Sequence, residues 1–345
     1  MSQARVLFHC PSRRGLGHVM RGSNLARAVT ALDGEAAVLV HVANPAAGPA
    51  CGDVPWVATP AEASAWTQVC AAFRPTLVVF DTLLPNAWAS SPSQAFVWRA
   101  SVDTRQAATA GDARLRAMRR IVVPHGPDEV AAVPDDLADR VVFTGPIVRA
   151  TDEAGQARVR ARYGLSPDDT VITSTVGGGG FDDSAAWLLD LVGDAHARWQ
   201  GHVPRLRHLV VRGPLAAADG PTRATPAGMT VIDADPDLVH LLALSTLVVA
   251  EAGYNTAHEL RHVGTPAVLA PGARTYDDQR ARAEALARLG QARVVDRADR
   301  AAALDTLAAL AVDHTALAAM RAAAAATPLM TGNARAAAAL LDVAR

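Results

Sequence analysis

The chain of 345 residues contains no lysine, so its fixed positive charge comes from 33 arginines. This absence excludes a lysine nucleophile, a Schiff-base lysine and the lysine of a Walker-type phosphate loop. Cysteine is also scarce, because Cys10, Cys51 and Cys70 are too few and too irregularly spaced for a disulfide framework or a cysteine-based zinc site. The formal net charge is only -1, so no global field favours nucleic acid or an anionic membrane.

Long apolar runs are missing as well. No apolar stretch is long enough to span a bilayer, and the N-terminus lacks the apolar core of a signal peptide. These absences predict a soluble, cytoplasmic protein. With 50% hydrophobic and 19% charged residues, the composition is that of a globular protein, and the length suits two domains of about 150 residues each.

What the chain does contain is an alternation of short β-branched apolar runs with helical patterns, which indicates βαβ units and a parallel sheet. The expected strands of the first half are 6–8, 38–42, 77–80, 120–123 and 140–143. Those of the second half are 170–173, 209–212, 230–232, 246–250, 267–269 and 292–295.

A domain junction is expected between the two series of strands. Residues 145–156 carry glycine, proline and charges but few apolar residues. We therefore expect an N-terminal domain over 1–148 and a C-terminal domain over 149–330. The alanine-rich tail favours helix, and its break at 328–333 indicates a separate final helix over about 331–345.

The stretch FHCPSRRGLGHVMRGSNLARAV connects the first apolar run to an expected helix. It is not a dinucleotide fingerprint, because Met20 stands where a further glycine is needed. The second strand is also followed by Ala43 and Asn44 rather than by an acidic residue. Binding of a nicotinamide dinucleotide is therefore poorly supported.

The same loop predicts a ligand site at a helix N-terminus. Gly15 and Gly17 would let a ligand approach the backbone N–H groups closely. His18 would lie in the first helical turn, where the positive helix end keeps an imidazole neutral and suited to act as a general base. The alternative is that the glycines only make a tight turn and His18 is an ordinary polar residue.

Asp81 follows a buried apolar run in RPTLVVFDTLLPNAW. Such strand ends line the ligand cleft of doubly wound domains, so Asp81 is a candidate to orient the His18 imidazole and stabilise its protonated form. The alternative is that Asp81 caps the next helix.

Four consecutive glycines, Gly177, Gly178, Gly179 and Gly180, separate a strand from a helix in the second half. Such a run can wrap an anion in backbone N–H groups. Asp182, Asp183 and Ser184 argue against this, because they could cap the helix themselves and repel phosphate.

The strongest local signal is STLVVAEAGYNTAHELRHVGTPAVLAPGARTYDDQRARAEAL, residues 245–286. It indicates strand, turn, helix, strand and a loop that ends in Asp277, Asp278 and Gln279. A helix beginning at Asn255 or Thr256 could hold a diphosphate on its N–H groups, and Glu259 could accept both hydroxyls of a ribose. The alternative is a capping box, in which Glu259 only caps its own helix from Thr256.

The same stretch contains His258-Glu259-Leu-Arg-His262, which matches the H-E-x-x-H pattern of zinc peptidases. Here, however, the helix is a crossover between two strands, ended by Gly264 and Pro266. The only obvious third ligand is Glu284, in an arginine-rich helix. We therefore disfavour a zinc site.

Taken together, these motifs resemble the GT-B glycosyltransferases, in particular the MurG-like branch with a family 28-type C-terminal domain. The resemblance rests on GLGH near the start, TGPIVR at the junction, the glycine run and the EAGYNTAHELRHVGTPAVLAPG segment. It implies an α/β fold of two Rossmann-like parallel-sheet domains that face each other across a cleft. The final helix would cross back to the first domain.

The resemblance also implies a function. A nucleotide-diphosphate sugar, with a UDP-sugar favoured, would bind the C-terminal domain, and a small-molecule or lipid-linked acceptor the N-terminal domain, with no metal required. By motif position, Gly253, Asn255 and Thr256 would contact the diphosphate, Glu259 the ribose, and Asp278 with Gln279 the sugar. Ile232 would lie at the nucleobase, and residues 177–180 would form a second phosphate-side loop.

His18 matches the histidine of the family's N-terminal loop, which makes it the expected general base. The segment GLGHVMR also resembles the opening of PseG-type nucleotide-sugar hydrolases, which share the fold. In these enzymes the histidine activates water, so hydrolysis is the alternative function.

Overall fold

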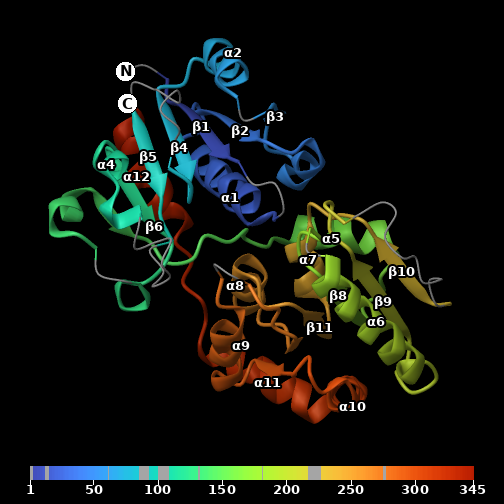
Figure 1. Cartoon of the computed structure of the whole chain (residues 1–345). Helices are drawn as coiled ribbons and strands as arrows, with labels where there is room; N and C mark the ends of the chain where they lie inside the picture. The colour runs from blue at the N-terminus through green and yellow to red at the C-terminus, as the bar shows by residue number, and fades with distance from the viewer. Residues whose placement is uncertain are drawn as a thin grey trace. The chain divides into compact units, whose positions relative to one another are not determined.

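The computed structural model describes residues 3–11, 15–60, 62–84, 93–99, 109–130, 133–180, 182–216, 227–274 and 277–345. The chain forms two compact units. Unit 1 comprises Met1–Val148 and Met330–Arg345, and unit 2 comprises Arg149–Leu329 (Figure 1).

Within its described residues, unit 1 is built around a seven-stranded parallel sheet in the order β3-β2-β1-β4-β5-β6-β7. Its strands are β1 (Arg5–Cys10), β2 (Ala37–Val42), β3 (Trp56–Ala58), β4 (Leu77–Asp81), β5 (Gln94–Val97), β6 (Arg120–Val123) and β7 (Val141–Phe143). Its helices are α1 (Gly17–Leu32), α2 (Ala63–Phe73), α4 (Ala113–Arg116) and α12 (Asn333–Ala344), with 3-10 turns η1 (Pro45–Cys51), η2 (Pro127–Glu129) and η3 (Asp135–Arg140).

The described part of unit 2 contains a six-stranded parallel sheet in the order β10-β9-β8-β11-β12-β13. Its strands are β8 (Thr170–Thr175), β9 (Leu206–Val211), β10 (Met229–Ile232), β11 (Leu247–Ala250), β12 (Ala267–Leu269) and β13 (Ala292–Val294). Its helices are α5 (Glu153–Tyr163), α6 (Asp182–Trp199), α7 (Leu238–Leu244), α8 (Tyr254–Val263), α9 (Gln279–Arg288), α10 (Arg300–Leu310) and α11 (His314–Ala326).

The two sheets share one strand order. Numbered within its own unit, each runs 3-2-1-4-5-6, and unit 1 adds a seventh strand. This is the doubly wound Rossmann arrangement, in which the order reverses between the first and fourth strands and ligands bind at that switch point. The switch points lie between β1 and β4 in unit 1 and between β8 and β11 in unit 2.

Local sequence explains these elements. Parallel strands covered on both faces need near-continuous apolar runs, and β4 and β11 are buried at every residue. In unit 2 several helices begin after an aspartate whose carboxylate accepts a backbone N–H, as Asp299 does from Ala302 and Asp313 from Ala316. α8 ends at Gly264, which adopts a left-handed φ of 69°.

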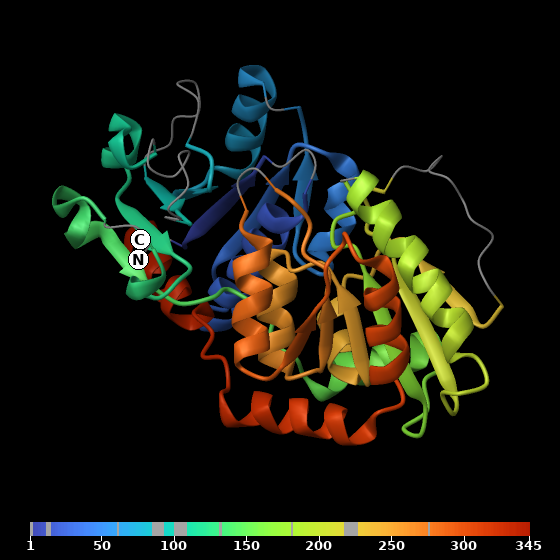
Figure 2. The ribbon, with the colours of Figure 1, turned by 60° about the horizontal axis from the view of Figure 1, so that its bottom comes forward.

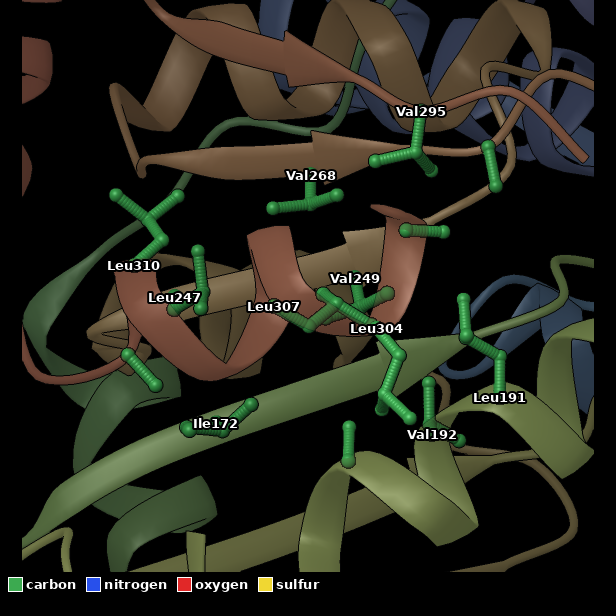
Figure 3. Close-up of a cluster of buried hydrophobic side chains, with 14 of the residues drawn as sticks. Ile172, Leu191, Val192, Leu247, Val249, Val268, Val295, Leu304, Leu307 and Leu310 are labelled. Atoms are coloured by element: carbon green, nitrogen blue, oxygen red, sulfur yellow. The ribbon is translucent and has the colours of Figure 1, made fainter. Parts of the chain in front are cut away.

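The core of unit 2 shows how one face of its sheet is covered. Leu191 and Val192 of α6 and Leu304 and Leu307 of α10 pack against the sheet, together with Ile172, Leu247, Val249 and Val268 from β8, β11 and β12 (Figure 3). α6 and α10 lie side by side on this face (Figure 2). Residues of α7, α8 and α9 form a separate apolar cluster with Val248 and Ala250, which point to the opposite face.

All eleven strands expected from the sequence are present, but two were missed. β3 (Trp56–Ala58) and β5 (Gln94–Val97) have three and four residues, too short for an alternation or an apolar run to stand out. β3 lies at the sheet edge, and none of its three residues is fully buried.

The final helix α12 belongs to unit 1, where it packs against α1 (Figure 1). Its first residue, Asn333, binds both backbone polar groups of Val148: its Oδ1 accepts the N–H (3.1 Å) and its Nδ2 donates to the carbonyl (2.6 Å). The N–H of Gly332 donates to the carbonyl of Pro146 at 2.7 Å.

None of the helices within the described residues is, by itself, long and apolar enough to cross a membrane. α10 and α11 together meet the requirement on length and composition only, with a bend of 89° between them.

Candidate active site

His18 and Asp81 meet at the switch point of unit 1. His18 is the second residue of α1, directly after β1, and Asp81 is the last residue of β4, the strand paired to β1. The His18 Nδ1 and Asp81 Oδ1 atoms lie 2.9 Å apart. The Asp81 side chain is 3% exposed and that of His18 is 24% exposed, so the carboxylate is buried while the imidazole stays accessible.

Arg21 is a third member of this cluster that the sequence analysis missed. Its guanidinium donates from Nε to Asp81 Oδ2 (2.8 Å) and from Nη2 to Asp81 Oδ1 (2.5 Å). Arg21 lies three residues after His18 on α1, so both side chains occupy one helix face. The spacing of His18 and Arg21 within GLGHVMR could have indicated that the two side chains are neighbours. It does not reveal that the Arg21 side chain is buried, with only 2% of the residue exposed.

The surroundings keep Asp81 ionised. Burial alone would raise its pKa, but the Arg21 charge and the hydrogen bond and charge of His18 hold it well below its usual range. An ionised carboxylate can only accept hydrogen bonds, so Nδ1 of His18 carries the proton that faces it. In the neutral imidazole, Nε2 is then the unprotonated nitrogen, the state that a general base requires.

The alternative role of Asp81 as a helix cap concerns residues 85–92, which lie outside the described residues. The glycines before His18 are described. Gly17 is the first residue of α1, and a Cβ added there would meet no atom within 4 Å. Neighbouring side chains therefore do not explain this glycine.

The glycine run of unit 2 follows β8 at its switch point, and part of it is explained by packing. Gly179 adopts a φ of 78°, and a Cβ there would come within 2.4 Å of the carbonyl oxygen of Arg212. Gly178 accepts a hydrogen bond from the N–H of Leu215 at 3.0 Å. Gly177 also has a positive φ, 68°, but faces open space, so the run combines tight packing with an open backbone at its start.

Of the three residues predicted to cap the next helix, Ser184 has another role. α6 begins at Asp182, and the hydroxyl of Ser184 donates to Glu251 instead of capping the helix. Glu251 follows β11 and is buried, with Arg274 Nη2 at 2.6 Å from Oε2 and Arg297 Nη2 at 2.7 Å from Oε1. This cluster connects the ends of β11, β12 and β13 to the start of α6.

α8 begins at Tyr254, one residue before Asn255 and two before Thr256, the two predicted starts, and Gly253 is its N-cap. The capping-box alternative is therefore wrong, because Glu259 is the sixth helical residue and too far along α8 to reach the N-cap. A Cβ at Gly253 would meet no atom within 4 Å. Asn255 and Thr256 are the second and third residues of α8, where N–H groups are available to ligands.

Glu259, further along α8, is also buried. It is 4% exposed, and within the described residues its side chain makes neither a hydrogen bond nor an ion pair. Burial raises the pKa of Glu259 to about 7, against an opposing effect of the Arg149 charge. A buried carboxyl group that lacks partners costs free energy, and a diol would supply two donors.

The H-E-x-x-H pattern forms no metal cluster in the part of the chain that is described. No group of three or more histidine, cysteine, aspartate or glutamate side chains there is arranged to hold a metal ion. The ring of His258 lies edge-on to Tyr254, with centroids 4.5 Å apart.

The remaining predicted residues have local structural partners. Asp278 is the N-cap of α9 and accepts the N–H of Ala281 at 2.9 Å, and the Oε1 of Gln279 accepts the N–H of Gly272 at 2.8 Å. The carbonyl of Ile232 accepts the N–H of Arg212 at 2.9 Å. These bonds leave the second carboxylate oxygen of Asp278 and the Nε2 of Gln279 for a ligand.

Both units thus present candidate residues at the switch point of a doubly wound sheet, which is the architecture of the GT-B class. Comparisons with known proteins agree. Residues 183–337 match the family described as "Glycosyltransferase family 28 C-terminal domain".

A curated relative supports the predicted MurG-like resemblance. It is the UDP-N-acetylglucosamine–N-acetylmuramyl-(pentapeptide) pyrophosphoryl-undecaprenol N-acetylglucosamine transferase of Methylobacterium radiotolerans, 32% identical over 176 residues. The match covers 49% of this chain and 46% of the relative, so the chain spans about half the length of this relative.

Solved structures match over nearly the full chain. Spinosyn rhamnosyltransferase SpnG complexed with thymidine diphosphate is 16% identical, with a TM-score of 0.60 over 99% of this chain and 100% of that one. SpnG complexed with the spinosyn aglycone is 17% identical, with a TM-score of 0.58 over 99% of this chain and 100% of that one. Acinetobacter baumannii MurG is 14% identical, with a TM-score of 0.57 over 98% and 99%. These matches confirm the predicted GT-B fold.

Proposed function

We propose that the protein is a glycosyltransferase that moves a sugar from a nucleotide-diphosphate sugar, with a UDP-sugar favoured, to a small-molecule or lipid-linked acceptor. The observation that carries this proposal is Glu259, a buried carboxyl group on the helix that follows β11, which makes no hydrogen bond to any of the described residues. It lies inside the segment that matches the family 28 C-terminal domain.

Unit 2 would bind the donor. The N–H groups at the start of α8, with Gly253, Asn255 and Thr256, would hold the diphosphate, and Glu259 would accept hydrogen bonds from both ribose hydroxyls. Ile232 would lie at the nucleobase, and the free polar atoms of Asp278 and Gln279 would contact the sugar. Residues 177–180 would form a second loop beside the phosphates; since the N–H of Gly177 already donates to Thr175 Oγ1 at 3.1 Å, the contact would come from the glycines that follow it.

Unit 1 would bind the acceptor and supply the base. As the acceptor oxygen or nitrogen forms its bond to the anomeric carbon, Nε2 of His18 would take its proton. Asp81 would hold the imidazole and stabilise the imidazolium that forms. The bond from the anomeric carbon to the diphosphate breaks, and the helix N-termini would stabilise the negative charge that departs, so no metal is required.

The second candidate is hydrolysis of the nucleotide sugar. It is favoured by the same observation in unit 1, because an accessible Nε2 oriented by a buried carboxylate could equally take a proton from water. Incubation of the protein with UDP-sugars separates the two functions: a transferase consumes the donor rapidly only with an acceptor, whereas a hydrolase needs none.

The first experiment is a thermal-shift panel with UDP, TDP and GDP on the wild type, Glu259→Gln and Glu284→Gln. A ligand at about 100 times its dissociation constant adds roughly 2.7 kcal/mol to stability. One nucleotide should stabilise the wild type and the control Glu284→Gln, whose site lies on the exposed face of α9, but not Glu259→Gln. If no nucleotide stabilises the wild type, the proposed donor site is wrong.

A further inference from the structure

Asp81 accepts more hydrogen bonds than its contact with His18 requires. Its Oδ1 atom accepts from His18 Nδ1 (2.9 Å), from Arg21 Nη2 (2.5 Å) and from the Thr82 hydroxyl (2.7 Å). Its Oδ2 atom accepts from Arg21 Nε at 2.8 Å. The Arg21 guanidinium thus donates to both Asp81 oxygens in a two-pronged (bidentate) contact, which fixes the plane of the carboxylate.

Thr82 closes this arrangement through a strained backbone. It has a φ of 60°, which is rare for a β-branched residue. The N–H of Leu83 donates to the Asp81 carbonyl (2.7 Å), which makes a tight turn centred on Thr82. In this turn the Thr82 hydroxyl accepts from Arg21 Nη2 at 2.9 Å while it donates to Asp81.

Three titratable groups near this cluster are neutral at physiological pH. Burial lowers the pKa of His9 to about 3 and also lowers the pKa of His125, and burial raises the pKa of Cys10 well above its usual range. Arg99 and Glu129 carry charges that act on His125. Among the groups that lower the pKa of Asp81, Arg21 carries the fixed positive charge, which offsets that of the carboxylate.

We propose that Arg21 and Thr82 are positioning residues, which lock the Asp81 carboxylate in the one orientation that accepts the Nδ1 proton of His18 and leaves Nε2 unprotonated. This inference rests on the proposed function, in which His18 is the general base. Arg21 has a second effect. It offsets the Asp81 charge, so its removal would leave that charge free to favour the protonated form of His18, which cannot act as a base.

Strain at Thr82 fits this role. A left-handed β-branched residue is energetically unfavourable and persists only where the surrounding structure over-determines it, which happens mainly at functional sites. Here the over-determination comes from three groups: the Val97 carbonyl that accepts the Thr82 N–H (2.8 Å), Asp81 and Arg21.

The test is NMR of the eleven histidines, labelled with 15N, which reports the tautomer and the titration midpoint of each ring. His18→Gln assigns the His18 signals. Arg21→Met removes the charge, Arg21→Lys keeps it without the two-pronged contact, and Thr82→Val keeps the side-chain shape without the hydroxyl. Arg27→Met is the matched control, since Arg27 lies on the same helix but pairs with the exposed Asp53.

We expect wild-type His18 to be the tautomer protonated at Nδ1 and unprotonated at Nε2. Arg21→Met should raise the His18 midpoint by about one pH unit or more, a tenfold change in protonation. Arg21→Lys should raise it less, Thr82→Val should allow some of the other tautomer, and Arg27→Met should change neither property.

A wild-type His18 protonated at Nε2 would overturn the proposal. So would an unchanged tautomer and midpoint in folded Arg21→Met and Thr82→Val. If Arg21→Met does not fold, Arg21→Lys and Thr82→Val decide the question by the same criteria. The readout needs no sugar nucleotide, so its failure is distinct from a failure of the proposed transferase activity, which donor-consumption assays measure.

Discussion

The candidate site of each unit contains a buried carboxyl group, Asp81 in unit 1 and Glu259 in unit 2, and the two have opposite surroundings. Asp81 in unit 1 is surrounded by donors from His18, Arg21 and Thr82, so it remains charged. Glu259 in unit 2 has no hydrogen-bond partner among the described residues, and burial raises its pKa to about 7. A carboxylate whose acceptor sites are filled can orient a neighbour, whereas one whose sites are empty is ready for a ligand.

The largest test of this comparison is to make the same chemical change in both units. Asp81→Asn leaves the Arg21 guanidinium buried without a counter-charge, which should cost about 3–5 kcal/mol of unfolding free energy. Glu259→Gln removes a carboxyl group that burial penalises, so at pH 8 it should add on the order of 1 kcal/mol.

Urea unfolding at pH 8 measures both changes. The sign for Glu259 follows from its raised pKa: the penalty for ionising the buried group is absent below about pH 4.5, grows as the pH rises from there to about 7, and is constant above that. The advantage of Glu259→Gln should therefore be much smaller at pH 5 than at pH 8. Equal destabilisation by both substitutions would show that the two carboxylates are not different in kind.

The second prediction concerns turnover. His18→Ala should reduce it by about 10²–10⁴-fold, the usual contribution of a general base, and leave the affinity for nucleotide unchanged because the donor would bind unit 2. Donor consumption and calorimetric titration with nucleotide give the two values. His202→Ala, at an exposed histidine of unit 2, is the control. Loss of turnover and binding together would mean that His18 is structural.

The third prediction sharpens the ligand role of Glu259. Its ionised form accepts both ribose hydroxyls, so nucleotide affinity should rise as the pH increases through 7 and level off near pH 8. In Glu259→Gln the affinity should be about 10-fold lower at pH 8, because a hydrogen bond to a charged group is worth about 1.5–3 kcal/mol. The pH dependence should also vanish. A parallel slope in both proteins would contradict the role of this carboxyl group.

The last prediction has the smallest expected effect per residue on the free energy of unfolding. It concerns a feature that the two units share. Each contains a stacked, buried histidine pair beside a tryptophan: His9 and His41 near Trp66, and His196 and His208 near Trp199. Burial lowers the pKa of His9 to about 3, of His41 to about 4 and of His208 to about 3.

These histidines should make both units acid-sensitive. Because the unfolded chain binds protons at these positions below about pH 6.5 and folded His9, His41 and His208 do not, the stability that their neutral forms contribute is fully present above that pH. The free energy of unfolding should fall by about 1.4 kcal/mol per pH unit for each of these three histidines as the pH drops from 6 to 5. Urea unfolding between pH 7.5 and 5 measures the loss, and a flat profile would show that the pairs accept protons while folded.

Much of the fold followed from the sequence, because strands covered on both faces must be apolar along their length. Continuous apolar runs predicted the four central strands, β1, β4, β8 and β11. The ends of these strands in turn predicted where the site residues lie. His18 and Asp81 were found because each stands directly at the end of such a run.

The remainder depended on contacts that periodicity does not encode. Arg21 occupies an ordinary helical position, and only the pairing of β1 with β4 brings Asp81 to it and makes its burial favourable. The proposed capping box failed for a similar reason. A Thr-x-x-Glu spacing fits any helix start, and here Gly253 caps α8 while Glu259 is buried deeper in the fold.

The bonds of Asn333 and Gly332 to Val148 and Pro146 bring the two places where the chain leaves and re-enters unit 1 next to each other. In topological terms, unit 2 is an insertion into unit 1, and both of its ends attach at one point. Excising residues 149–329 and joining Val148 to Met330 by a short linker would thus leave every strand of unit 1 in its place. The excised segment would carry all the residues proposed for the donor, which makes the two halves separable parts for construction as well as for study.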